Sequence, residues 1–316
     1  METWLADVKG YVQTGCACSG PGHLGSVIKA VHITSVPPRV VAIKLLPRGD
    51  LVRTNRLAIQ RQIKDYVALY HPFFIRLREL FLTPSHLAIV MEYADGRDLE
   101  ILIRKEGRLI EQMARWIFQQ LIIALDFSHH VGVGMRDLRL ENILLDRMGR
   151  NTIRPIVKIC DFSYIKRETS LEATLGDLTL GDPASSAAKE ADTWSCGVIL
   201  YRMLYGKVPS FAAELTAADY KVLQDVQLSA ECRDILKRLL TPNSAERICI
   251  EDIKRHAWYL KDLPDGALEM NDFYVTAVSQ MRLQECNAGI DSIVDQAQDC
   301  EALSAAGIQH CTISRI

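Results

Sequence analysis

The chain has 316 residues, of which 48% are hydrophobic and 24% are charged, and these proportions are ordinary for a folded globular protein. The formal net charge of −2 and the shortness of every aliphatic run in the sequence give no sign of a nucleic-acid or membrane partner. Nine cysteines scattered from Cys16 to Cys311 favour reduced thiols, so we expect a soluble protein of the cytoplasm and/or nucleus.

A glycine-rich stretch is the first motif, with Gly20, Gly22 and Gly25 followed by Val27. Glycine is needed where backbone N–H groups approach phosphate oxygens closely, because a Cβ would block the approach. A similar stretch opens dinucleotide-binding folds, but there it runs into a helix. Here the alternation of apolar residues over 27–33 predicts a strand, so the loop joins two strands. A plain hairpin turn rich in glycine is the alternative.

The next elements form a strand, a helix and a pair of strands. Residues 40–46 predict a buried strand with one cation, Lys44, which needs an anionic partner such as a nucleotide phosphate. A helix is expected over 57–70, ending before His71-Pro72. Two strands over 75–82 and 86–92 follow, and the change from apolar to polar residues over 91–96 predicts a hinge between two lobes.

The stretch over residues 131–146 carries the expected chemistry and follows a long amphipathic helix over 110–130. Asp137 and Asn142 stand five apart within it. A carboxylate and a carboxamide at this spacing can serve one phosphate, because the first accepts a proton from the attacking hydroxyl and the second holds a metal ion. A buried strand over 156–160 then leads to Asp161 and Phe162, a second signal for a metal ligand.

The C-terminal half is interpreted as core helices over 192–206, 229–240 and a final pair that ends at residue 260. His129 and His130 end the helix over 110–130. We interpret them as favoured by the helix C-terminus rather than as metal ligands, because no further ligand follows at suitable spacing.

In this order the motifs resemble those of eukaryotic protein kinases, over about residues 5–262. Within that superfamily the chain looks closest to plant SNF1-related kinases of the osmotic-stress, abscisic-acid-linked subclass. The stretches that carry this closer resemblance are 82–94, 138–146, 158–162 and 254–264.

The resemblance implies an α+β bilobal fold, with a small β-rich N-lobe that carries one regulatory helix and a larger, mainly α-helical C-lobe. We expect the N-lobe over residues 1–92, the C-lobe over 93–262 and a C-terminal regulatory tail over 263–316. Ile290, Ile293, Val294 and Ala297 form an apolar stripe similar to that subclass's regulatory helix, which packs on the N-lobe. An ordinary amphipathic end helix is the alternative.

The resemblance also implies roles around ATP and Mg²⁺. Lys44 would hold the α- and β-phosphates, and Asp137 would orient the substrate hydroxyl. Asn142 and Asp161 would bind Mg²⁺, and Arg139 would replace the usual loop lysine near the γ-phosphate. The expected nucleotide site comprises Gly20, Gly22, Gly25, Val27, Ala42, Lys44, Glu92 and Ala94 of the hinge, Asp98 near the ribose, Asn142 and Asp161.

The sequence departs from the family pattern at several positions. Gln62 stands where kinases have the helix glutamate that pairs with the lysine, Ser163 replaces the glycine of D-F-G, and Met135 replaces the histidine of H-R-D. The short segment before Asp192 contains no A-P-E motif. The absence of this motif puts the platform for the substrate peptide in question.

Two functions are consistent with these residues. The first is an ATP-dependent serine/threonine protein kinase, related to stress or other signalling and with reduced activity, whose substrates are proteins. Glu141 would favour a basic residue upstream of the target hydroxyl, and an upstream kinase or a phosphatase would act on Thr174. The alternative is a pseudokinase that serves as a nucleotide-binding or scaffold module.

Overall fold

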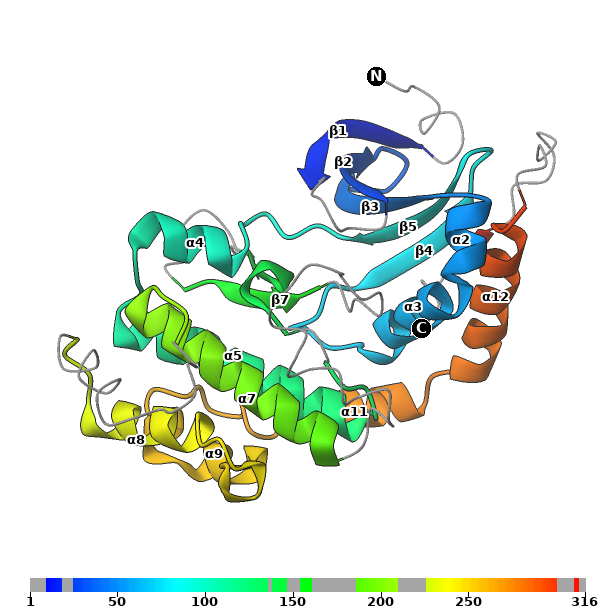
Figure 1. Ribbon diagram of the computed structural model, residues 1–316. Coiled ribbons are helices and arrows are strands. Elements are labelled where there is room, and N and C mark those ends of the chain that lie inside the picture. The colour runs from blue at the N-terminus through cyan, green and yellow to red at the C-terminus, as the bar shows by residue number, and fades with distance from the viewer. Residues whose placement is uncertain are drawn as a thin grey trace. The chain divides into compact units, whose positions relative to one another are not determined.

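The computed structural model describes residues 10–18, 25–135, 138–146, 154–160, 186–209, 226–299 and 310–312. These residues form two compact units, shown in Figure 1. The first contains the described residues up to Tyr93 and those from Val278 onward, and the second contains those between Ala94 and Ala277. The boundary at residues 277–278 falls within helix α11, Met270–Ser279.

The first unit is built on an antiparallel sheet with strand order β1-β2-β3-β5-β4-β8. Alternate residues of these strands point to one face, where Tyr11, Ile43, Phe81 and Val90 belong to a buried apolar cluster. The expected strands are present, and β8 adds one that the sequence did not indicate. The strand bounds are β1 Tyr11–Cys18, β2 Ser26–His32, β3 Arg39–Pro47, β4 Leu77–Leu82, β5 His86–Glu92 and β8 His310–Thr312.

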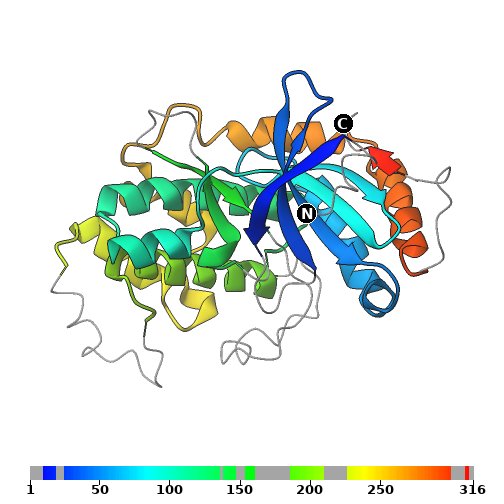
Figure 2. The ribbon, with the colours of Figure 1, turned by 90° about the horizontal axis from the view of Figure 1, so that it is seen from above.

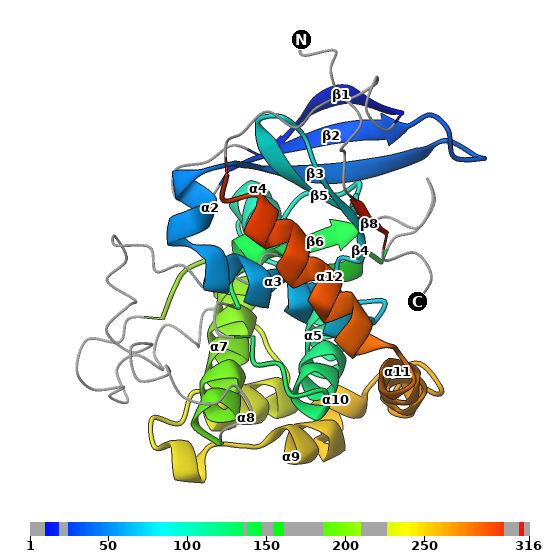
Figure 3. The ribbon, with the colours of Figure 1, turned by 90° about the vertical axis from the view of Figure 1, so that its right-hand side faces the viewer.

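Three helices complete the first unit: α2 (Asp50–Thr54), α3 (Arg56–Ala68) and α12 (Leu283–Gln296). Helix α12 lies along α3, as the views in Figures 2 and 3 agree. Its apolar stripe is buried, with Ile290 and Val294 fully shielded from solvent. Ion pairs flank this contact, since Arg56 Nε lies 2.5 Å from Asp295 Oδ1 and Lys64 Nζ lies 2.7 Å from Asp291 Oδ1. The expected packing of a tail helix on the N-terminal part is confirmed.

The second unit is mainly helical and contains one small sheet. Strands β6 (Ile143–Asp146) and β7 (Ile156–Ile159) pair antiparallel next to the long, almost wholly buried helix α5 (Glu111–His130). The remaining helices are α4 (Leu99–Glu106), α7 (Ser186–Tyr205), α8 (Ala230–Leu239), α9 (Ile250–Arg255) and α10 (Ala257–Leu260), with short 3₁₀ turns η1 (Leu140–Asn142) and η3 (Ser244–Glu246).

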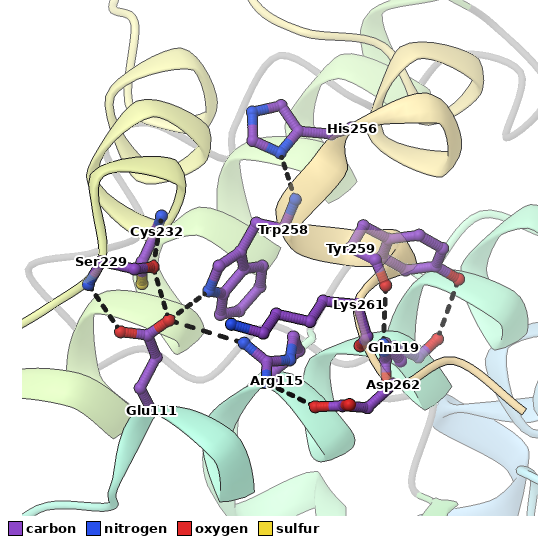
Figure 4. Close-up of polar contacts among 10 residues, drawn as sticks. All are labelled: Glu111, Arg115, Gln119, Ser229, Cys232, His256, Trp258, Tyr259, Lys261 and Asp262. Carbon is purple, nitrogen blue, oxygen red and sulfur yellow. Dashed lines mark hydrogen bonds and ion pairs between the residues drawn. The ribbon is translucent and has the colours of Figure 1, made fainter.

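Helix α5 is joined to α8 and α10 by the polar network in Figure 4. Glu111 accepts hydrogen bonds from the backbone N–H and hydroxyl of Ser229, at 2.8 and 2.7 Å, and from the indole N–H of Trp258, at 2.8 Å. Arg115 Nη2 donates to Asp262 Oδ2 at 2.8 Å. Gln119 donates to the carbonyls of Tyr259 and Lys261. Because these groups satisfy one another, we interpret the network as structural.

One helix of the second unit begins earlier than expected. Helix α7 begins at Ser186, before the expected start at Asp192, because residues 186–191 are good or neutral helix formers without an apolar stripe. In the same unit, Arg247 donates to the carbonyls of Glu190, Thr241 and Pro242 and lies over the ring of Trp194. Among the helices in the described part of the chain, none is long and apolar enough to cross a membrane.

Candidate active site

Strand β3 places the lysine of the candidate site at the centre of the first unit's sheet. Lys44 pairs with Val27 on β2 and with Ile89 on β5. Because directly paired residues of antiparallel strands point to the same face, Val27 and Lys44 share one face. Ala42 lies two residues before Lys44 and therefore points to that face as well. Lys44 is 6% exposed, so its long side chain is largely shielded from solvent. The structure thus brings together three residues of the expected nucleotide site.

Gly25 ends the glycine stretch and must be glycine for two reasons. Its φ is +79°, a conformation that side chains with a Cβ rarely adopt, and a Cβ built there would lie 2.1 Å from the carbonyl oxygen of Leu45. The end of the loop is therefore held tightly against β3. Gly20 and Gly22 lie outside the described residues, so their approach to phosphate stays a prediction.

Helix α3 carries Gln62 in the expected place on the first unit. The side chain is buried, at 7% exposed, among the apolar residues Ile59, Ile63 and Tyr66 of the same helix. An amide is a reasonable side chain at such a site, because it can hydrogen-bond without the cost of burying a charge. A bond between Gln62 and Lys44 remains a prediction.

In the second unit, Asn142 is placed by the 3₁₀ turn η1 directly before β6. It is 6% exposed, its backbone N–H donates to the carbonyl of Arg139 at 3.1 Å, and its carbonyl accepts from Cys160 N at 2.9 Å. Ile143 pairs with Ile159 in the β6–β7 ladder. The start of β6 and the end of β7 therefore lie side by side, which brings Asn142 next to the residue that precedes Asp161.

The expected metal ligands are a carboxamide and a carboxylate, and oxygen donors of this kind suit Mg²⁺. Asp161 lies outside the described residues. Within the described ranges, no group of three histidine, cysteine, aspartate or glutamate side chains is placed to hold a metal ion.

The catalytic loop begins at a buried anchor that the sequence did not reveal. Asp192 Oδ2 on α7 accepts from the backbone N–H of Met135 at 3.2 Å and lies 2.9 Å from His129 Nε2 at the end of α5. Asp192 is 3% exposed. The carboxylate therefore ties α5, α7 and the start of the loop together. The sequence signal that could have indicated this anchor is the position of Asp192, a charged residue in a helix that is otherwise largely apolar after it.

The same contact corrects the interpretation of His129. Its side chain pairs with Asp192 instead of serving the helix terminus. His130 does serve the last turn, since its Nδ1 lies 2.7 Å from the carbonyl oxygen of Asp126. Asp137 itself, which follows Met135 by two residues, lies outside the described residues together with Ser163 and Thr174.

The hinge segment is anchored separately in each unit. In the first, Glu92 ends β5 and exchanges hydrogen bonds with the backbone of Arg76: its N–H donates to the Arg76 carbonyl at 2.9 Å, and its Oε2 accepts from Arg76 N at 3.2 Å. In the second, Asp95 N donates to Asp146 Oδ1 at 3.2 Å. A Cβ on Gly96 would lie 1.5 Å from the Leu145 carbonyl oxygen, so glycine allows the segment following Ala94 to lie against β6.

Asp98 begins helix α4, and its Oδ1 accepts from Ile101 N at 2.8 Å. Burial raises the pKa of the Asp98 carboxyl, the bond from Ile101 opposes the rise, and the charges of Glu141 and Glu100 add to it. Asp98 and Glu141 therefore lie near one another in the second unit. Arg139, the expected phosphate contact, lies on the same short loop as Glu141.

Comparisons with known proteins fit this geometry. The sequence pattern of the protein kinase domain matches residues 18–259. The serine/threonine-protein kinase SAPK2 of Oryza sativa subsp. japonica is 39% identical over 301 residues, which cover 89% of this chain and 85% of that protein. SRK2H of Arabidopsis thaliana, also named a serine/threonine-protein kinase, is 42% identical over 251 residues, covering 73% of this chain and 67% of that protein. SRK2A of Physcomitrium patens, of the same description, is 40% identical over 254 residues, covering 74% and 70%.

Proposed function

The chain belongs to the protein kinase family, and we propose that it transfers the γ-phosphate of ATP to serine and threonine hydroxyls of protein substrates. The observation that best supports this is the hydrogen bond between Asn142 and Cys160, which brings the expected catalytic loop next to the expected metal loop. The pseudokinase alternative is not favoured, because the relatives reported above are named as kinases.

Each polar residue has a definable part in the reaction. Lys44 neutralises charge on the α- and β-phosphates from a fixed position on the sheet. Asp137 accepts the proton of the substrate hydroxyl as the oxygen attacks phosphorus. Mg²⁺, when bound, offsets the negative charge of the phosphate oxygens, and Asn142 and Asp161 are the residues that would hold it. Arg139 places a permanent positive charge near the transferred group.

Substrate preference follows from the acidic group at the start of α4. Asp98 and Glu141 lie near one another, and like charges gain from a cationic neighbour. Glu100 is less available, because Arg202 and Arg104 hold its carboxylate at 2.9 and 2.7 Å. We therefore propose that a basic residue of the substrate, upstream of the target hydroxyl, faces Asp98 and Glu141.

The experiment is transfer of radiolabel from γ-labelled Mg²⁺-ATP to a basic peptide with one serine. We expect labelling that requires the serine and falls by about 100-fold or more in Asp137→Ala, since general-base catalysis contributes on that order. A peptide with alanine in place of the upstream basic residue should be a poorer substrate of the unmodified chain, and Glu141→Gln should reduce that difference. Equal labelling by the unmodified chain and Asp137→Ala would overturn the proposal.

Thr174 remains the proposed site for regulation by an upstream kinase or phosphatase. A phosphate on Thr174 could pair with Arg136 and order the segment around it. Both residues lie outside the described ranges, so the support for this proposal is the sequence alone. Mass spectrometry of the protein after treatment with and without phosphatase, paired with the transfer assay, tests it, and activity unchanged by loss of a Thr174 phosphate would contradict it.

A further inference from the structure

Three arginines gather at one end of the first unit's sheet, away from Lys44. Antiparallel pairing sets this end: Tyr11 pairs with His32, which pairs in turn with Arg39 at the start of β3. On the other side of β3, the end of β5 pairs with the start of β4. Arg76 directly precedes β4, and Arg78 is the second residue of that strand. Strands β1, β3 and β4 therefore all begin at the end of the sheet where these guanidinium groups lie.

The arginine cluster, Arg39, Arg76 and Arg78, is only partly neutralised by the described part of the chain. Among described residues, no carboxylate lies within ion-pair distance of the three guanidinium groups. The Nε of Arg78 is buried without a hydrogen-bond acceptor. Burial lowers the pKa of Arg78, and its neighbours Arg39 and Arg76 lower it further, whereas Glu92 opposes the shift.

The two nearby carboxylates already have other donors. Glu79 Oε1 accepts from the hydroxyl of Tyr11, whose ring stacks on His32 with centroids 4.4 Å apart. Glu92 Oε2 accepts from the backbone N–H of Arg76. The charge of these two carboxylates partly offsets that of the cluster, but their oxygens already accept hydrogen bonds from Tyr11 and from the backbone of Arg76. Arg39 and Arg76 are exposed, so a carboxylate of a partner could form charge-assisted hydrogen bonds with their guanidinium groups.

A pocket adjoins the cluster and shares Arg76 with it. It encloses about 300 Å³ of space, its open mouth included, at the end of α3 and the start of β4. Tyr66, Tyr70, Leu77 and Met281 supply aromatic and aliphatic walls. The guanidinium of Arg76 lies over the ring of Tyr70, 4.5 Å from its centroid, so the cation stands beside an apolar pocket.

We propose that the arginine cluster and this pocket together form a docking site for an acidic segment of a partner protein, with one apolar side chain of the segment in the pocket. The planar guanidinium groups bind carboxylates through paired N–H donors, and the pocket beside Arg76 has apolar and aromatic walls that an apolar side chain can contact. The site lies at the end of the sheet where β1, β3 and β4 begin, whereas Lys44 lies further along β3.

The overall charge favours a protein segment over a polyanion. A chain with a net charge of −2 has no broad positive field to attract nucleic acid or an anionic bilayer, and three arginines beside a single pocket match a short acidic peptide better. Docking of this kind would raise the local concentration of a substrate or hold a regulator without touching the reacting groups.

The test measures binding of a fluorescein-labelled, glutamate-rich peptide with one central phenylalanine, by fluorescence anisotropy at low and high salt. The main variant is Arg39→Glu with Arg76→Glu, because both side chains are exposed and tolerate exchange. Met281→Trp fills the pocket without changing charge. The matched control is Arg255→Glu on α9, an exposed arginine of the second unit.

We expect the double variant to bind the peptide at least about tenfold more weakly, since reversing two charge-assisted contacts is worth more than 1.4 kcal/mol. Met281→Trp and a peptide with alanine for phenylalanine should each weaken binding, salt should weaken it, and Arg255→Glu should leave it unchanged. Binding that is equal in the double variant and the unmodified chain would overturn the proposal. So would retention on anionic lipid vesicles or nucleic acid without binding of the peptide.

Discussion

Lys44 in the first unit and the Asn142 loop in the second are held by different kinds of interaction. Lys44 extends from a central strand whose neighbours Ile43 and Leu45 are buried in an apolar cluster. The loop is held by individual polar contacts, from Asp192 to Met135 and from Asn142 to Cys160. The stabilisation from apolar packing spreads over many contacts and falls with the volume that is removed, whereas a buried polar anchor depends on one or two atoms. The two regions should therefore respond differently to substitution.

The largest effect is expected at Lys44. Lys44→Met keeps a long apolar stem in the buried strand but removes the charge, so folding should be preserved while kcat/KM for ATP falls about 100- to 1,000-fold. Steady-state phosphate transfer measures the fall, and a denaturant titration checks the fold. A matching loss of stability and activity would mean that Lys44 acts through the structure rather than on phosphate.

Substitutions in helix α12 test how much apolar packing contributes to the stability of the first unit. Ile290→Ala should cost about 2–5 kcal/mol of unfolding free energy, because the side chain is fully buried against its surroundings. Asp295→Ala, which breaks a half-exposed ion pair with Arg56, should cost about 0.2–1 kcal/mol. Urea titrations of both variants compare the two contributions. A larger loss for Asp295→Ala would show that charge rather than packing holds α12.

The polar anchor of the second unit is tested at Asp192. Asp192→Ala leaves the buried Met135 N–H and His129 without their acceptor, which should cost about 1–3 kcal/mol. It should also lower kcat, because the start of the catalytic loop loses its support. Asp192→Asn keeps one acceptor oxygen and should recover part of both losses. If Asp192→Ala kept full kcat, positioning of the loop would not depend on this contact.

A further expected effect concerns Glu111 and the dependence of stability on pH. Burial alone would raise the pKa of Glu111, but bonds from Ser229 and Trp258 and the charge of Arg115 together lower it below the ordinary 4.5. A lowered folded-state pKa adds stability above the unfolded-state pKa, and this stability is lost as the pH falls through the folded-state value. Glu111→Gln should therefore cost about 1–2 kcal/mol near neutrality and progressively less below about pH 4.

Urea titrations of the unmodified chain and Glu111→Gln across this pH range measure the difference directly. The exposed residue Glu285 offers the control, because Glu285→Gln removes a carboxylate of the first unit with a long ion pair of 3.5 Å to Arg282. A stability difference for Glu111→Gln that stays constant with pH would contradict the role of its charge.

The contrast also explains what the sequence could predict. Strand β3, helix α3 and strand β5 appear within one or two residues of their expected bounds, because burial imposes a period on the sequence. The protein kinase resemblance is confirmed by the match over residues 18–259, and the bilobal expectation agrees with two compact units. Burial also imposes the apolar stripe from which the sequence predicts the tail helix.

Contacts between distant polar residues could not be predicted in this way. The pairing of His129 with Asp192 joins residues 63 apart, and no period or spacing marks it. The partners of Arg247 are backbone carbonyls, which have no signature in a sequence. The pocket beside Arg76 and strand β8 likewise depend on tertiary arrangement. The roles assigned to Asp137 and Asp161 stay predictions.

The most direct test of the account is the turnover of the unmodified chain measured beside Gln62→Glu and Asp137→Ala, with saturating Mg²⁺-ATP and a basic serine peptide. A neutral amide in place of the carboxylate should weaken the contact to Lys44 by about 1 kcal/mol, so the unmodified chain should turn over within about tenfold of Gln62→Glu and far above Asp137→Ala. Turnover no greater than that of Asp137→Ala, restored only by Gln62→Glu, would contradict the claim that this protein is a working kinase.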